Sequence, residues 1–133
     1  MIIETHATLR VFSESLSRDR ISEVLGVNAT GGHEKDPSAK SRSKRESSYW
    51  CWTTKGALET ADNSAHIDQI INKFQDKEHA LRELREQGCE TDICSFLVTT
   101  GQGGPELELS TMASLNKLGL PIWWDIYFDE NET

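Results

Sequence analysis

The chain has 133 residues, of which 36% are hydrophobic and 27% are charged, a composition that excludes an intrinsically disordered chain and suits one domain with one core. Its 22 acidic and 14 basic residues give a formal net charge of −8. This charge disfavours nucleic acid as a direct partner, because affinity for a phosphate backbone comes largely from Lys and Arg, and it favours a basic protein surface.

The amino terminus shows no targeting signal. MIIETHATLR has only two large apolar residues before Glu4 and no basic region ahead of them, unlike a secretory signal peptide. No window approaches the roughly 20 apolar residues that span a bilayer. The three cysteines, Cys51, Cys89 and Cys94, fit reduced thiols better than a disulfide framework. We therefore expect a cytoplasmic protein that does not bind membranes.

The first predicted element is a strand at residues 5–13, where apolar and polar positions alternate. Its two sides carry Ala7, Leu9 and Val11 against Thr8, Arg10 and Phe12. A short helix follows over residues 18–25, with Ser17 as its amino-terminal cap and Gly26 as its stop.

Residues 28–47 contain no large apolar residue and no periodicity, so we expect a flexible polar loop. Five basic residues against three acidic ones give this loop a charge of +2, so the remainder of the chain carries −10. A loop of about 20 residues inside a compact domain is often functional. A dispensable insertion is the other interpretation.

Residues 49–54, YWCWTT, form the second predicted strand, in which Trp50 and Trp52 share one face of the pleat. Residues 64–87 then show apolar side chains at helical spacing and end at Gly88. The apolar stripe is interrupted near Asp76, where we expect this long helix to bend or split.

Residues 90–100 and 105–109 predict an antiparallel hairpin joined by the glycine-rich turn 101–104. Ser110 is expected to cap a third helix that ends at Gly119, before a last strand at residues 120–128 and a frayed acidic tail, 129–133. The order predicts a single α+β domain over residues 1–133. We expect a mostly antiparallel sheet of about five strands with three helices packed on one face.

Four segments together resemble a bacterial family known as domain of unknown function 4279. They are ATLRVFSESLSRDRISEVLGV, the strand with Trp50-Cys51-Trp52, GCETDICSFLVTT and LNKLGLPIWWDIYF, which together reach over nearly the whole chain. The resemblance implies an α+β fold and a bacterial origin, and it brings no catalytic residues with it. The basic loop and the doubled Trp123-Trp124 depart from the family's pattern.

Motifs for catalysis and for cofactors are missing from the sequence. It holds no nucleophile motif such as G-x-S-x-G, and Cys51 and Cys94 lie within strand patterns, where a thiol usually serves as a small apolar filler. Cys89 and Cys94 have no second Cys or His pair at zinc spacing, and TTGQGGPE lacks the lysine of a phosphate-binding loop. We therefore expect neither a metal nor a cofactor.

Two carboxylates leave acid/base chemistry open. Asp92 and Asp125 both fall on predicted strands, and such chemistry would need a partner such as His6. A cross-strand ion pair between Arg10 and Asp125 is the simpler interpretation, and we favour it.

The open face of the sheet is the candidate binding site. Alternation along the last strand places Trp123, Asp125 and Tyr127 on the side away from the helices, and the first strand adds polar and aromatic side chains to that side. Trp50 and Trp52 either join this face or lie under the long helix. The candidate binding residues are Arg10, Phe12, Trp50, Trp52, Trp123, Asp125 and Tyr127. Tryptophan beside polar groups on an uncovered face is typical of interface anchors.

These observations favour a noncatalytic protein-binding module. A specific version is an immunity protein that neutralises a basic, nuclease-like bacterial toxin by occupying its positive cleft. The alternative is a small-molecule-binding domain, or an enzyme, that uses a pocket between the sheet and the 28–47 loop. A homodimer formed through the tryptophan-bearing face is a third hypothesis.

Overall fold

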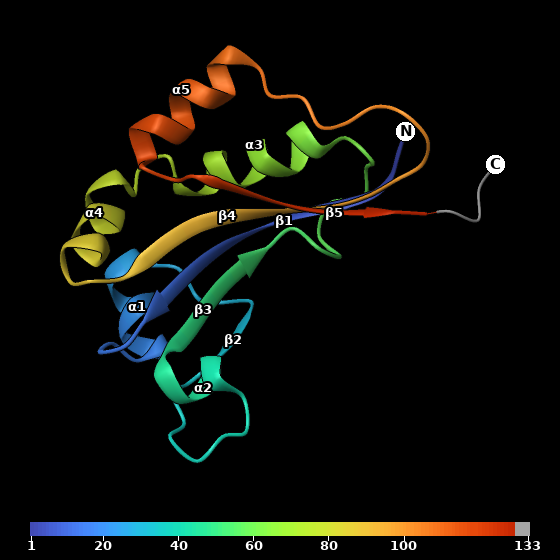
Figure 1. Cartoon of the computed structure of the whole chain (residues 1–133). Coiled ribbons are helices and arrows are strands. Elements are labelled where there is room, and N and C mark those ends of the chain that lie inside the picture. Colours follow the sequence, from blue (N-terminus) through green and yellow to red (C-terminus); the bar gives the residue numbers. More distant parts are fainter. Residues whose placement is uncertain (130–133) are drawn as a thin grey trace.

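A computed structural model describes residues 1–129 and shows a five-stranded sheet with helices along one side (Figure 1). The strand order is β2-β3-β1-β4-β5. The strands are β1 (Ile2–Ser13), β2 (Gly31–His33), β3 (Ser48–Thr53), β4 (Glu90–Thr99) and β5 (Ile122–Phe128). The long central strand β1 pairs antiparallel with β3 and β4, and β2 pairs antiparallel with β3.

The sheet is mixed, because β5 runs parallel to β4. A parallel neighbour needs a crossover connection, and helix α5 between the two strands supplies it. The α+β class and a sheet of five strands are confirmed, but β2 takes the place of the predicted strand at residues 105–109. The expectation of a mostly antiparallel sheet holds for three of the pairings and fails at this edge.

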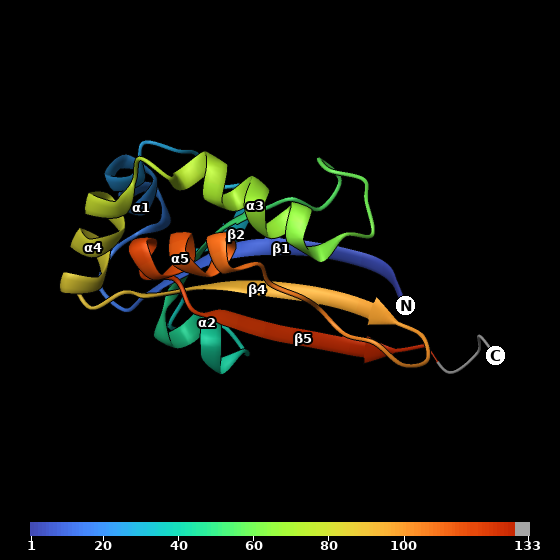
Figure 2. The same ribbon diagram turned by 90° about the horizontal axis from the view of Figure 1, so that it is seen from above.

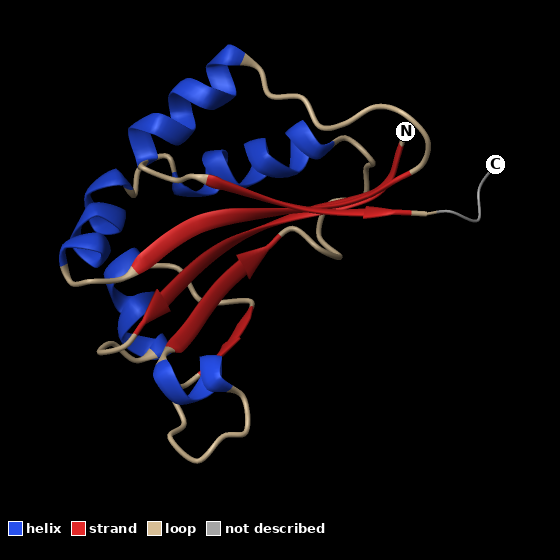
Figure 3. Cartoon of the chain, in the orientation of Figure 1, coloured by secondary structure: helices blue, strands red, loops and turns tan. Residues whose placement is uncertain are grey.

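The described part of the chain contains five helices rather than the three that the sequence predicts. They are α1 (Arg18–Leu25), α2 (Arg42–Glu46), α3 (Asn63–Phe74), α4 (Glu78–Glu86) and α5 (Leu109–Leu118). Figure 3 shows α3 and α5 above the sheet and α1 and α4 at its left end, whereas α2 lies at the lower end of β3. None of these helices is long and apolar enough to cross a bilayer.

The predicted long helix is two helices, with the break where the apolar stripe is interrupted. The Lys77 amide donates to the Phe74 carbonyl, which closes a turn between α3 and α4. The split lets both apolar faces reach the curved sheet. Phe74 ends α3 fully buried, and Leu81 and Leu84 are the buried residues of α4.

The predicted hairpin is wrong, because residues 105–108 are not a strand. This segment runs back over the helix-covered side of the sheet toward α5 (Figure 2). Its carbonyl at Glu106 accepts from Asn63 Nδ2 (3.4 Å) and Ser64 Oγ (3.0 Å), at the start of α3. Polar and apolar residues alternate in PELEL because Leu107 packs against the core. The segment does not pair with any strand of the described chain.

The core lies between the sheet and the helices. Alternate residues of β1 from Thr5 to Ser13 are buried on this side, as the predicted alternation requires. The core's hydrophobic members include Leu9, Val11, Trp50, Ile67, Ile70, Phe74, Leu81 and Ile93. His66 is also buried there, with Nδ1 2.5 Å from Thr54 Oγ1 and Nε2 2.9 Å from the Thr60 carbonyl.

The 28–47 segment contains an edge strand and a short helix that the sequence does not predict. At Gly32 φ is 121°, and an added Cβ would lie 2.0 Å from the Tyr49 carbonyl oxygen, so this β2 position excludes every side chain. Helix α2 buries no residue. The predicted frayed tail lies, from residue 130 onward, outside the described residues.

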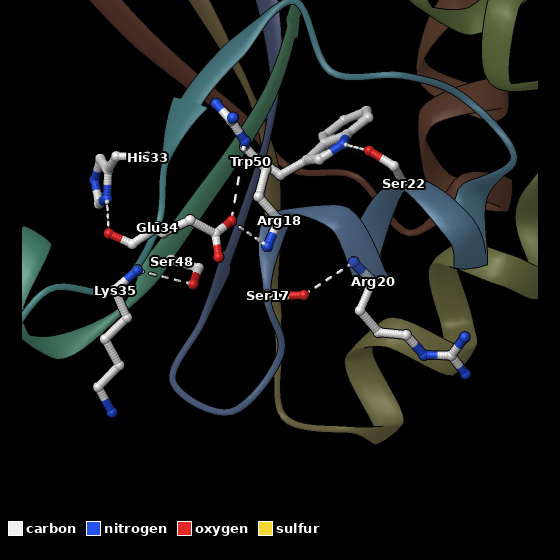
Figure 4. A network of polar contacts seen from close by, with 9 residues as sticks. All are labelled: Ser17, Arg18, Arg20, Ser22, His33, Glu34, Lys35, Ser48 and Trp50. Carbon is white, nitrogen blue, oxygen red and sulfur yellow. Dashed lines mark hydrogen bonds and ion pairs between the residues drawn. The ribbon is translucent and has the colours of Figure 1, made fainter.

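Side chains anchor this segment to α1 and β3 (Figure 4). Glu34 Oε1 accepts from the Arg18 amide at 2.7 Å, so a carboxylate caps the amino terminus of α1, where the helix dipole favours negative charge. The Lys35 amide donates to Ser48 Oγ at 3.1 Å. The stretch at Glu34 and Lys35 is therefore fixed to the body of the domain.

Candidate functional site

The candidate site is the face of the sheet that no helix of residues 1–129 crosses. Strand alternation determines which side chains lie on this face. In each strand, the residues on either side of a buried residue point to it. The side chains on it come from all five strands: His33 of β2; Tyr49 and Cys51 of β3; His6, Thr8, Arg10 and Phe12 of β1; Asp92, Cys94 and Phe96 of β4; and Trp123, Asp125 and Tyr127 of β5. We call this set the open face.

An ion pair occupies the middle of the open face. Arg10 Nε lies 2.7 Å from Asp92 Oδ1, and Arg10 Nη2 lies 2.8 Å from Asp92 Oδ2, a bidentate geometry. Both side chains are about a quarter exposed, at 23% and 26%. The hydrogen bond to Asp92 raises the pKa of Arg10. The predicted pair between Arg10 and Asp125 is wrong, because β4 lies between their strands.

An aromatic cluster lies on one side of this ion pair, across β2, β3 and β1. Phe12 and Tyr49 stack with ring centroids 4.9 Å apart, and His33 meets Tyr49 at 5.7 Å. The Arg10 guanidinium lies 5.5 Å from the Phe12 ring centre, within cation–π range. The ion pair and this cluster therefore form one connected surface.

A second aromatic cluster lies on the other side, across β1, β4 and β5. His6 stacks on Phe96 at 4.6 Å, and Phe96 meets Tyr127 at 5.5 Å. Trp123 is 60% exposed and Tyr127 54% exposed, so both rings face solvent. Asp125 stands opposite Phe96 in the strand register and places a carboxylate within this cluster.

The two tryptophans of β3 are not on the open face. Trp50 pairs with Val11 and Trp52 with Leu9, and both buried β1 residues point to the helices. Trp50 is fully buried, and its Nε1 donates to Ser22 Oγ of α1 at 2.9 Å (Figure 4). Both indoles contact the edge of the Phe74 ring. This placement removes Trp50 and Trp52 from the candidate surface.

Four titratable groups of the open face, outside its central ion pair, have pKa values shifted toward the neutral form. Burial raises the pKa of Tyr49 and of the Cys94 thiol, and burial lowers the pKa of His6. The negative charge of Asp125 raises the pKa of Tyr127. A thiol held protonated is a poor nucleophile, and a neutral, stacked imidazole contributes ring surface. The electrostatics of the face therefore suit binding.

An acidic hollow of about 390 Å³ borders the open face at Phe12. Its lining residues are Phe12, Ser13, Glu14, Glu46, Ser47, Gly88 and Glu90. Its three exposed carboxylates line the hollow together with Phe12, and Glu46 pairs with Arg42 at 2.8 Å. The carboxylates match the side chain of an arginine or lysine from another molecule.

A second hollow, of about 340 Å³, lies where β1 extends past the end of β3. It is lined by residues 3–6 of β1 and by loop residues that include Lys55 and Glu59. The Nδ1 atom of His6 is buried without a hydrogen-bond partner in the described chain. Within residues 1–129, no group of three or more His, Cys, Asp and Glu side chains is arranged to hold a metal ion.

In the described chain, three hollows border the 28–47 loop. They are lined by Glu46 and Ser47, by Glu34 and Lys35, or by residues 28–31. None of these three hollows is lined by Arg10, Asp125 or Tyr127 of the open face.

Sequence reasoning missed Phe96 and Asp92 as members of the site, and it left Tyr49 undecided. Both sides of β4 carry apolar residues, so its pattern alone does not say which side is open. Asp92 could have identified the open side of β4. A carboxylate next to buried Ile93 must point away from the core, and strand alternation then places Cys94 and Phe96 on the same side as Asp92.

Comparison with known proteins identifies the family of the chain but assigns no function to it. No curated protein and no solved structure matches the chain significantly. The profile of one family, described as a domain of unknown function (DUF4279), matches residues 3–129, which include all residues of the open face and the whole sheet apart from Ile2 at the start of β1. The chain belongs to the DUF4279 family.

Proposed function

We propose that this chain is a noncatalytic binding module whose open face docks onto a basic surface of another protein. The observation that carries the proposal is the open face itself, where two aromatic clusters flank a bidentate ion pair and two large rings are more than half exposed. Exposed aromatic residues on a rigid sheet make good interface anchors, because they bury large areas at low cost in side-chain entropy.

Charge supports a basic partner. The net charge of −8 attracts positively charged surfaces at long range and raises their association rate. At short range, the acidic hollow beside Phe12 offers carboxylates to a guanidinium or an ammonium group.

A specific version of the proposal is an immunity protein for a basic, nuclease-like bacterial toxin. Such a protein acts by covering a positive cleft, so it needs complementary shape and charge and no chemistry of its own. Small size, acidic charge and an aromatic face support this version. The raised pKa of the Cys94 thiol and the lowered pKa of His6 are consistent with a role that needs neither nucleophile nor acid.

Site-directed photo-crosslinking in cells tests the proposal. A photoactivatable residue in place of exposed Trp123 is expected to capture a basic protein, whereas the same residue in place of Lys117, exposed on α5, is not. The yield of this crosslink should fall in Glu14→Gln and Glu90→Gln, and it should fall with added salt when the crosslinking is repeated in a cell lysate. The matched control Glu83→Gln, exposed on α4, should leave the yield unchanged. Equal capture from both positions, or capture of acidic proteins alone, would contradict the proposal.

The second candidate is a small-molecule-binding domain or an enzyme, and one observation favours it. The 340 Å³ hollow is lined by His6, Lys55 and Glu59, side chains that suit a polar ligand, and the buried Nδ1 atom of His6 has no hydrogen-bond partner in the described chain. A thermal-shift screen separates the two candidates. A metabolite that raises the melting temperature, and loses this effect in His6→Phe, would favour the hollow over protein docking.

A further inference from the structure

The outer edge of β5 carries unpaired backbone groups. The Pro121 carbonyl accepts from the Ile93 amide, and the Asp129 amide donates to the Thr99 carbonyl, so odd-numbered residues of β5 bond to β4. Because the N–H and C=O groups of a strand alternate in direction, those of the even-numbered residues point away from the sheet. These residues are Ile122, Trp124, Ile126 and Phe128. In the described chain no strand lies beyond them.

This edge lacks the features that usually protect edge strands. The other edge strand, β2, has three residues, and two of them are glycine. In contrast, β5 is seven residues long, contains neither proline nor lysine, and carries one charge, Asp125. Its exposed side chains are large: Phe128 is 68% exposed and Ile126 39% exposed, in addition to Trp123 and Tyr127. An edge of this kind favours pairing with another strand.

We propose that β5 pairs antiparallel with β5 of a second copy of this chain, which would join two sheets into one of ten strands. A two-fold axis perpendicular to the sheet pairs even-numbered residues with even-numbered residues and keeps both open faces on the same side. The proposed dimer therefore leaves the open faces available and doubles the surface that a partner can contact.

The charge on β5 disfavours one register of this pairing. If the axis passes through Asp125, the two carboxylates stand directly opposite each other, which is unfavourable. With the axis at Ile126, Asp125 stands opposite Tyr127 of the second copy, and Trp124 stands opposite Phe128. This register also centres the contact on the most exposed half of the strand. The strand is thus complementary to itself.

The contact area is that of a weak interface. Trp123 and Tyr127 point to the open face, so the exposed side chains that the pairing can cover are Ile126 and Phe128, roughly 200 Å² per copy or roughly 400 Å² for the pair. The two backbone edges add to this area, but the total stays below the roughly 1,200 Å² of stable interfaces. We therefore expect a weak dimer that dissociates on dilution.

Single-cysteine crosslinking tests both the pairing and its register. In Ile126→Cys the new thiols face each other across the axis at a hydrogen-bonded position, where the Cβ atoms are about 5.5 Å apart, too far for an unstrained disulfide but within reach of a short bis-maleimide. The bis-maleimide should therefore link Ile126→Cys chains. Trp124→Cys or Phe128→Cys alone should not link, but a mixture of the two should. The unmodified chain, with its half-buried or buried Cys51, Cys89 and Cys94, controls for background.

Mass measurements give an independent result. Light scattering over a concentration series should show twice the mass of the 15.0-kDa chain at high concentration. Ile126→Pro removes one backbone N–H that points away from the sheet and keeps the hydrogen bonds between β5 and β4. This variant should be folded by circular dichroism and monomeric, whereas Ile126→Val should still dimerise. A chain that stays monomeric at every concentration, or Trp124→Cys linking by itself better than Ile126→Cys, would overturn the proposal.

Discussion

Arg10 and Asp92 hold the centre of the open face, and their pair is the strongest polar interaction on it. Two charge-assisted hydrogen bonds at 2.7 and 2.8 Å fix the guanidinium next to Phe12. Because both side chains are about three-quarters covered, removing one partner leaves the other charge poorly solvated.

We predict that Asp92→Asn lowers the free energy of unfolding by about 1–2 kcal/mol, measured by urea denaturation. The control is Glu78→Gln, which breaks the helix pair between Glu78 and Arg82 on the surface of α4. That change should cost about 0.5 kcal/mol or less. Equal losses in the two variants would show that the central ion pair is no more than a surface contact.

His6 should make the stability of the protein depend on pH. Its pKa is lowered from the ordinary value of 6.5, first by burial and then by Lys55, so the unfolded chain binds the proton more readily. Stability therefore falls as the pH drops through about 6.5 toward the folded-state pKa. Denaturation at pH 7.5 and 5.5 should show a smaller loss in His6→Phe than in the unmodified chain. His79→Gln, exposed on α4, should keep the full loss.

At the scale of elements, the tryptophans of β3 and β5 divide between core and surface. Trp50 fills the space between β3, α1 and α3, so Trp50→Ala should cost about 3–5 kcal/mol in unfolding free energy. Trp123→Ala, at a position 60% exposed, should cost about 1 kcal/mol or less. Thermal unfolding of both variants measures the difference. A large loss from Trp123→Ala would mean that this ring is structural.

The basic segment around α2 should be removable without loss of the fold. The Asp36 amide donates to the Lys44 carbonyl at 2.7 Å, so the two sides of this loop already meet. Replacing residues 37–43 with two glycines should change the unfolding free energy by about 1 kcal/mol or less, because α2 buries no residue. Cooperative unfolding with a much lower midpoint would contradict this expectation.

The elements differ in how far the sequence predicts them. The caps at Ser17 and Gly26 and the alternation along β1 act locally, so α1 and β1 appear where the pattern places them. The PELEL segment alternates equally well, but its backbone bonds to the start of α3, a contact that residues distant in sequence decide. Trp50 and Trp52 lie on the helix side of the sheet because Trp50 pairs with Val11, which points to that side. The residue pattern of the strand alone does not predict which residues of β1 and β3 pair.

At the scale of the whole molecule, the fold leaves one side of a five-stranded sheet free and gathers the aromatic and charged residues of distant segments on it. The sequence predicts Trp123, Asp125 and Tyr127 as one group, because a single strand carries them. It does not predict that Phe96 and His6 complete their cluster, since this depends on the strand order β1-β4-β5. The open face is therefore a product of topology as much as of local pattern.

The most direct test of a docking role for the open face is oxidative labelling of the protein, first purified and then inside cells. Trp123 and Phe12 should be labelled in the purified protein and protected in cells, whereas Leu109 and Met112, exposed on α5 at 82% and 42%, should be labelled equally in both. Equal labelling of Trp123 and Phe12 in the two settings, or protection of the α5 residues instead, would contradict the proposed role of this face.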